Sequence, residues 1–179
     1  MYMGYKKPIT YIAGDWDHDY DAVDQLLTWN ESGRYGLTFS NAHDITQARD
    51  TSLNCSIKRS LSLRMNNSQK FVLIVGTHTC SLRAGKCCYC YEYRVDYWQQ
   101  PSCNRNYSID NRSYIEYECE KAVRDGLDII VLYKSVNVDR SLCPETVRYR
   151  GIHKAMRHWV GYHIEWDYQA VKAAFDYYE

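Results

Sequence analysis

Short apolar runs alternate with amphipathic segments along this chain of 179 residues. The runs Ile9–Ala13, Phe71–Val75 and Asp128–Tyr133 are rich in branched side chains, and the first two stop at a glycine. Continuous apolar runs of this length predict strands of a parallel sheet that is covered on both faces. A brief alternation at Leu37–Phe39 predicts a second strand in chain order, and Trp159–Trp166 is the candidate for a fifth.

Helical spacing marks the segments between these runs. From Tyr20 to Asn30, the apolar residues Val23, Leu26 and Leu27 follow the i, i+3, i+4 pattern of one helical face. Further helices are predicted from Thr51 or Ser52 to Met65, from Tyr114 to Gly126, and after a cap at Asp167. This alternation predicts an α/β, flavodoxin-like fold: a five-stranded parallel sheet in the order 2-1-3-4-5, with helices on both faces. We expect one domain over residues 1–179.

The charge balance narrows the choice of partners. Lysine plus arginine equals aspartate plus glutamate, at 22 each, so no net charge attracts nucleic acid or anionic lipid. No apolar run has the length of a membrane helix, and no signal core follows the first residues. We therefore expect a cytoplasmic protein that binds neither nucleic acid nor membranes.

A cysteine- and tyrosine-rich insertion spans residues 77–110. His78 and five of the eight cysteines lie in it: Cys80, Cys87, Cys88, Cys90 and Cys103. Thiolates and imidazole at short spacing can hold zinc, but a pair of Cys-x-x-Cys knuckles is missing, so we favour structural thiols and no metal. Because the insertion precedes the helix at Tyr114, we expect it to cover the pocket and to shape an acceptor site. The remaining cysteines (Cys55, Cys119, Cys143) are expected to be reduced core thiols.

Several enzyme classes are excluded because their sequence motifs are missing, first of all in the loop after the first strand. It has no Gly-x-Gly-x-x-Gly and carries Asp15, Asp17 and Asp19, which would repel a pyrophosphate at the next helix. The chain also has no P-loop and no Gly-x-Ser-x-Gly elbow. A phosphoacceptor receiver domain needs an aspartate after the third strand, where this chain reads Gly76–Thr79.

Three blocks carry a family resemblance. They are Phe39–Asp44 with Gln47–Ser52, Ile57–Leu61 with Asn66–Gly76, and Tyr114–Glu120 leading through Ala122 into Asp128–Tyr133. In this order and spacing the chain resembles the TIR-like domain of the ThsB proteins of Thoeris anti-phage systems. The resemblance covers about residues 9–135 without the insertion.

The resemblance implies an NAD-consuming enzyme, an NAD glycohydrolase or ADP-ribosyl cyclase or transferase. Such domains cleave the nicotinamide–ribose bond and make either a cyclic ADP-ribose isomer or an acceptor-linked product such as histidine-ADP-ribose. The family's catalytic glutamate lies in an aromatic-x-x-x-Glu element, here Tyr114 to Glu118. Where the family often has tryptophan and arginine, this chain has Tyr117 and Glu116. NAD is the substrate, and no cofactor is implied.

The chemistry agrees with a single carboxylate. Nicotinamide leaves as a neutral molecule, and the transition state resembles an oxocarbenium ion that one glutamate, Glu118, can stabilise. Residues four apart share one helical face, so Tyr114 and Glu118 are presented together. The predicted substrate-binding residues are Asp15, Trp16, Asn41, His43, Asp44, Tyr114 and Tyr117, with Trp16 or Tyr114 as stacking groups.

Each candidate has a structural alternative. Glu118 would also stabilise the dipole of its helix, and we expect its neighbours Glu116 and Glu120 to be solvated. The aspartates of the first loop suit either a hard cation or a simple helix cap, and we favour the cap. His43 suits either a base or a backbone-bonded loop residue, and Arg49 either a phosphate contact or an ion pair.

Two functions therefore remain. The first is an enzyme that responds to a phage-derived trigger and makes a nucleotide read by a separate effector. The second is a TIR-like adaptor that binds partners without chemistry. The last helix, with its stripe at Tyr168, Val171, Ala174, Phe175 and Tyr178, would be core in either case, and any exposed part would suit homo-oligomerisation.

Overall fold

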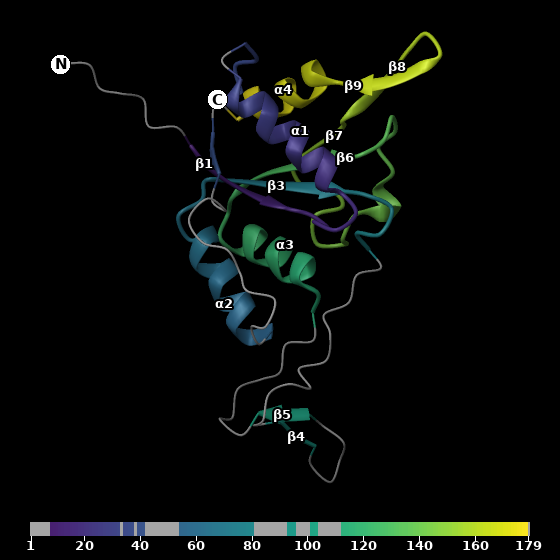
Figure 1. Ribbon diagram of the computed structural model, residues 1–179. Coiled ribbons are helices and arrows are strands. Elements are labelled where there is room, and N and C mark those ends of the chain that lie inside the picture. The colour runs from purple at the N-terminus through teal and green to yellow at the C-terminus, as the bar shows by residue number, and fades with distance from the viewer. Residues whose placement is uncertain are drawn as a thin grey trace, which may run out of the picture.

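Five parallel strands form the centre of the protein. A computed structural model describes residues 8–32, 34–37, 39–41, 54–80, 93–95, 101–103 and 112–178 (Figure 1). The strands are β1 (Ile9–Ala13), β2 (Ser40–Asn41), β3 (Lys70–Val75), β6 (Asp128–Tyr133) and β7 (Ile152–Ala155). Their order is β2-β1-β3-β6-β7, and every pairing is parallel. The predicted flavodoxin-like fold and strand order are confirmed.

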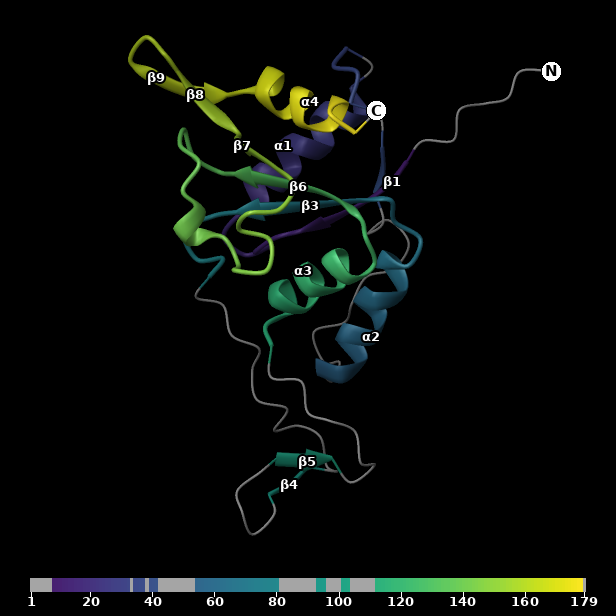
Figure 2. The same ribbon diagram turned by 180° about the vertical axis from the view of Figure 1, so that it is seen from behind.

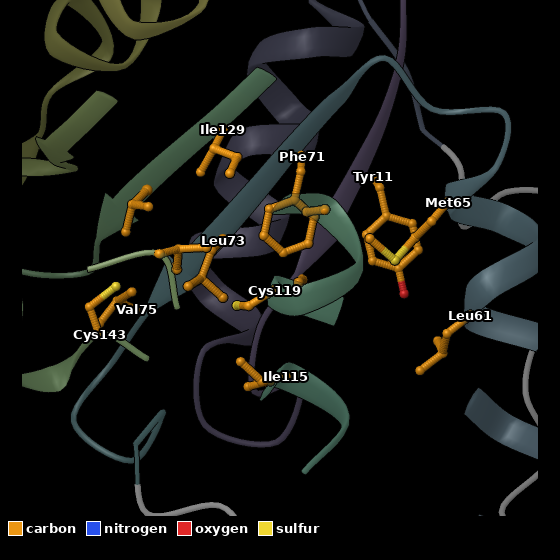
Figure 3. Packing of buried hydrophobic residues seen from close by; sticks show 14 of the residues in the cluster. Tyr11, Leu61, Met65, Phe71, Leu73, Val75, Ile115, Cys119, Ile129 and Cys143 are labelled. Carbon is orange, nitrogen blue, oxygen red and sulfur yellow. The ribbon is translucent and has the colours of Figure 1, made fainter. Parts of the chain in front are cut away.

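Helices cover both faces of this sheet. The helices α1 (Tyr20–Glu31) and α4 (Tyr168–Asp176) lie on one face, and α2 (Asn54–Met65) and α3 (Tyr114–Arg124) lie on the other (Figures 1 and 2). Side chains alternate across each strand, so neighbouring residues of β1 enter different cores. Tyr11 joins the cluster under α2 and α3 (Figure 3), and Ile12 joins the cluster under α1 and α4. None of the helices in the described ranges is long and apolar enough to cross a membrane.

Side-chain caps fix where α3 (Tyr114–Arg124) and α4 (Tyr168–Asp176) begin. Ser113 Oγ accepts a hydrogen bond from the backbone N–H of Glu116 at 3.1 Å, and Glu116 Oε2 accepts one from Ser113 N at 2.8 Å. This capping box satisfies two backbone donors and starts α3 at Tyr114, as predicted. The predicted cap of α4 is confirmed too, because Asp167 accepts from Ala170 N at 2.9 Å. The predicted start of α2, at Thr51 or Ser52, lies outside the described residues.

The second strand lies later than predicted. Leu37 and Phe39 are buried, but their segment is not part of β2. Both backbone groups of Phe39 bond to the side chain of Asn30, with Phe39 N donating at 2.9 Å and Asn30 Nδ2 donating to Phe39 O at 3.0 Å. Those groups are therefore not available to a ladder with β1, which pairs with Ser40 and Asn41 instead.

The prediction of a fifth sheet strand at Trp159–Trp166 is wrong. The fifth strand is β7, and Trp159–Trp166 contributes to a separate antiparallel hairpin of β8 (Arg157–Val160) and β9 (His163–Trp166). The aromatic and branched residues that suggested a buried strand are largely exposed on this hairpin. A further small pair, β4 (Tyr93–Val95) with β5 (Pro101–Cys103), falls within the predicted insertion. The assignment of a single domain to residues 1–179 stays a prediction.

Gly126 and Gly151 both have a positive φ, but only Gly151 lies close to other atoms. Gly151 (φ 74°) enters β7 so close to β6 that a Cβ atom would lie 2.1 Å from Ile129 O. Gly126 (φ 70°) ends α3, and a Cβ there would meet nothing within 4 Å. We expect Gly126→Ala to lower the free energy of unfolding by about 1 kcal/mol and Gly151→Ala by at least about 3 kcal/mol. Urea denaturation measures both, and equal losses would contradict the close approach of β6 and β7.

Candidate functional site

Glu118 lies in the second turn of α3, inside the protein. Its side chain is 5% exposed, and one carboxylate oxygen accepts a hydrogen bond from the hydroxyl of Tyr11. Ile115, Cys119 and Ala122 belong to the core cluster on the same side of the helix. Glu118 precedes Cys119 on this buried face of the helix, so its carboxyl group points toward β1 and α2. Figure 3 shows the partner: the Tyr11 hydroxyl points away from the sheet, near Met65 of α2.

Burial sets the charge of this glutamate. Removal from water raises the pKa of Glu118 to about 7, although the Tyr11 hydroxyl and the positive charge of Arg64 both act to lower it. Burial and the neighbouring Glu118 raise the pKa of Tyr11 well above its usual value. Tyr11 therefore remains a hydrogen-bond donor, while Glu118 changes between acid and carboxylate near neutral pH. A carboxyl group with such a shift suits catalysis, and burial in a structural network produces shifts of the same kind.

Positively charged groups surround the same part of α3. Arg64 of α2 is 8% exposed, and Lys58 of the same helix is 6% exposed. Lys58 Nζ donates to Arg112 O at 2.7 Å and lies 5.7 Å from the centre of the Tyr117 ring, while Arg112 Cζ lies 5.3 Å from that centre. Arg112 also pairs with Glu120. Three cations thus lie around Tyr117 and Glu118, an arrangement favourable to an anionic ligand such as a pyrophosphate.

The other predicted aromatic residue is at the beginning of the helix. Tyr114 is the first residue of α3, is half-buried, and packs against the core cluster that contains Ile115 and Cys119. Glu116 is occupied by the capping box, and Glu120 is exposed and paired with Arg112. The expectation that both glutamates are solvated therefore holds for Glu120 better than for Glu116.

The loop after β1 forms a second polar group of residues. Asp15 is 7% exposed, and its Oδ2 lies 2.6 Å from His18 Nδ1. The His18 ring lies 4.6 Å from that of His78, so the loops after β1 and β3 meet. Asp19 is buried, lies 3.6 Å from Lys134 Nζ, and makes no side-chain cap to α1. Over the ranges that the structure describes, no three or more His, Cys, Asp or Glu side chains are grouped to hold a metal ion.

The predicted site residues divide between these two places. Glu118 bonds to Tyr11 in the middle of β1, whereas Asp15 bonds to His18 beyond the end of that strand. Trp16, in the same loop as Asp15, is 41% exposed. Asn41 of β2 is buried and lies opposite Thr10 of β1. His43, Asp44 and Arg49 lie outside the described residues, as do Cys87, Cys88 and Cys90. Cys119 and Cys143 are free, buried thiols, as expected.

Sequence reasoning missed Tyr11, Arg64 and Lys58. Tyr11 carried a signal, because a tyrosine inside a buried strand needs a partner for its hydroxyl. The two cations carried none, since charged residues on a helix usually lie on the solvated face. Their position follows from the packing of α2 against α3.

A comparison with known protein families finds a family model that matches part of the chain. Residues 8–84 match the family model described as "Thoeris protein ThsB, TIR-like domain". Over this segment the chain is similar to the ThsB TIR-like domain. The resemblance drawn from the sequence is confirmed, and the match supports a role in Thoeris anti-phage defence. The matched segment of this ThsB-like chain includes Tyr11, Asp15 and Arg64, and it ends before α3 and Glu118. No curated protein matches the chain.

The raised pKa of Glu118 predicts a pH-dependent stability. A free carboxyl group titrates near pH 4.5, so between about pH 4.5 and about pH 7 the folded protein binds a proton at Glu118 that the unfolded chain has lost. The free energy of unfolding therefore falls as pH rises through this window, by up to about 3 kcal/mol, and levels off above it. Glu118→Gln should remove this component. Urea denaturation at about pH 5 and about pH 8 measures it. The same pH dependence in both proteins would show that Glu118 does not titrate as described.

Proposed function

We propose that this ThsB-like protein is a TIR-type enzyme that consumes NAD during phage infection. It cleaves the bond between nicotinamide and ribose and converts the ADP-ribose unit into a signalling nucleotide. The observation that carries the proposal is the buried carboxyl group of Glu118, held by Tyr11 and close to Arg64, in a chain whose residues 8–84 match the ThsB TIR-like family model. The protein would act in the cytoplasm, where NAD is present.

Glu118 acts as the carboxylate in this chemistry. As the glycosidic bond breaks, both bonding electrons leave with nicotinamide, which departs neutral, and positive charge develops on the ribose. A carboxylate in a site with little water stabilises that charge more strongly than one in bulk solvent. The hydrogen bond from Tyr11 fixes one oxygen, so the other is oriented for the ribose.

The surrounding cations suit the rest of the substrate. NAD has a pyrophosphate between its two riboses, and Lys58, Arg64 and Arg112 lie beside Glu118 and Tyr117. The Tyr117 ring offers a flat surface, although Lys58 and Arg112 are already in cation–π contact with it. Tyr114, Asp15, Trp16, Asn41, His43 and Asp44 complete the proposed substrate-binding set.

The fate of the ribosyl cation decides the product. Attack by water gives ADP-ribose and a proton, whereas attack by a nucleophile of the same molecule gives a cyclic isomer and a proton. Attack by an acceptor such as histidine gives a linked product, again with loss of one proton. We propose one of the last two outcomes, with a separate effector reading the product and a phage-derived component triggering the reaction.

An adaptor without catalytic activity is the second candidate. The observation that favours it is the closure of the site, since Glu118 is 5% exposed and already bonded to Tyr11. A buried, satisfied carboxyl group can serve only to fix α3 against β1. In that case any replacement that keeps the packing would preserve phage protection.

Glu118→Gln separates the two candidates. The amide keeps the size of the side chain and removes the negative charge, so nicotinamide release in infected cells should fall at least about a hundredfold, and protection should be lost. Nucleotide profiling of infected cells that contain the complete defence system measures both the loss of NAD and the new product. The control is Glu120→Gln, an exposed glutamate of the same helix. Protection that survives Glu118→Gln would establish the adaptor.

The hydrogen bond from Tyr11 predicts a shift of the pH profile. Because only the carboxylate stabilises the ribosyl cation, activity should rise with pH through about 7. Tyr11→Phe removes a donor that lowers the pKa of Glu118, so the midpoint should move to higher pH while the maximum rate changes less. Nicotinamide release by the triggered enzyme, measured from acid to alkaline pH, tests this. An unchanged midpoint would separate Tyr11 from the ionisation of Glu118.

A further inference from the structure

The hairpin of β8 and β9 projects beyond the central sheet (Figures 1 and 2). Its two strands are joined by Gly161 and Tyr162, and Tyr162 is 97% exposed. Trp159 is 61% exposed, and Val160 and Ile164 are each 44% exposed. A two-stranded hairpin on its own is marginally stable in water, and apolar side chains gathered at such a projection are typical of contact surfaces.

In the described ranges, the hairpin is joined by side chains at its base and by a backbone hydrogen bond along its β8 edge; Trp166 at its base packs edge-on against Trp29 of α1, with the ring centres 6.5 Å apart. The Arg157 guanidinium lies 4.0 Å from the centre of the Trp166 ring and bonds to Asp21 Oδ2 at 3.1 Å. The backbone N–H of Arg157 donates to Ser135 O at 3.3 Å, so the β8 edge is held to the segment after β6. Within the described ranges, no backbone hydrogen bond joins the outer edge of β9 to another segment.

The pairing within the hairpin shows which groups of β9 point outward. Asp167 N donates to Met156 O at 2.7 Å, so these opposed residues form a hydrogen-bonded pair just below the hairpin. Hydrogen-bonded and non-bonded pairs alternate in an antiparallel ladder, which makes Trp159 and Ile164 a non-bonded pair. The N–H and C=O of Ile164 therefore face away from β8, as a free edge requires.

We propose that β9 pairs in antiparallel fashion with β9 of a second copy of this chain, about a two-fold axis at Ile164. The two Ile164 residues then exchange both backbone hydrogen bonds across the axis. His163 of each copy lies opposite Glu165 of the other, which places a basic beside an acidic side chain twice. The result is a four-stranded sheet with Trp159 and Ile164 of both copies in one apolar row on the same face.

The β8 edge does not provide an equivalent contact. Self-pairing about Trp159 would place His158 opposite Val160, with no complementary charge. The same edge is also occupied by the bond from Arg157 to Ser135. Charge complementarity and the open edge therefore both select β9. The proposal involves no residue of the Glu118 site, so it stands or falls independently of NAD cleavage.

Matched lysine substitutions test the contact. Ile164→Lys places two like charges opposite each other across the axis, whereas Val160→Lys adds the same charge on β8, away from the pairing edge, at a residue of equal exposure. Sedimentation equilibrium over a concentration series up to the millimolar range suits a contact of this small size. We expect the chain of 179 residues to dimerise reversibly. The association constant should fall at least about tenfold in Ile164→Lys and change less than about twofold in Val160→Lys.

A charge exchange tests the register. His163→Glu and Glu165→Lys should each weaken the dimer, because each places like-charged or uncompensated side chains opposite one another. The double variant exchanges the two charges, so an acidic side chain again lies opposite a basic one, and most of the lost association should be recovered. Circular dichroism confirms that each variant is folded. A wild-type protein that stays monomeric throughout the series, equal effects of the two lysine variants, or no recovery in the double variant would each overturn the proposal.

Discussion

The contact between the Tyr11 hydroxyl and the Glu118 carboxyl group is the constraint around which this side of the fold is organised. A carboxyl group removed from water is costly unless it is hydrogen-bonded, and Tyr11 of β1 supplies a bond to one of its oxygens. The same burial raises the pKa of Glu118 to about 7. One contact thus joins α3 to β1 and sets the protonation of the residue that we propose to be catalytic.

Several local devices hold this contact in place. The capping box at Ser113 and Glu116 fixes the start of α3 and therefore the turn on which Glu118 lies. The parallel register of β1 with β3, in which Tyr11 lies opposite Phe71, fixes the position of Tyr11 along the sheet relative to α3. The charge of Arg64 reaches both members of the pair from α2. The segment that matches the ThsB TIR-like family model ends before α3, so the pair joins one residue inside the matched region to one beyond it.

The polar groups of the molecule are divided by the sheet architecture. The loops after β1 and β3 meet at one edge through His18 and His78, as expected for the carboxyl ends of parallel strands. Glu118 lies deeper, under β1 and beside α2. The hairpin of β8 and β9 lies beyond the last strand and depends on neither. Catalysis and self-association are therefore proposed for surfaces that can be altered separately.

The sequence by itself determined the layered α/β fold, the strand order and the start of α3, because apolar runs and helix caps are local signals and alternating strands and helices follow a common topology. It also placed Glu118 on α3, through a family motif. Only the tertiary structure decided which groups meet Glu118, because Tyr11 is 107 residues away and the approach of Arg64 depends on how α2 packs. The prediction for Trp159–Trp166 was wrong for the same reason. Its apolar pattern fits a buried strand, but whether a strand is buried depends on what packs against it. Most of this hairpin is exposed.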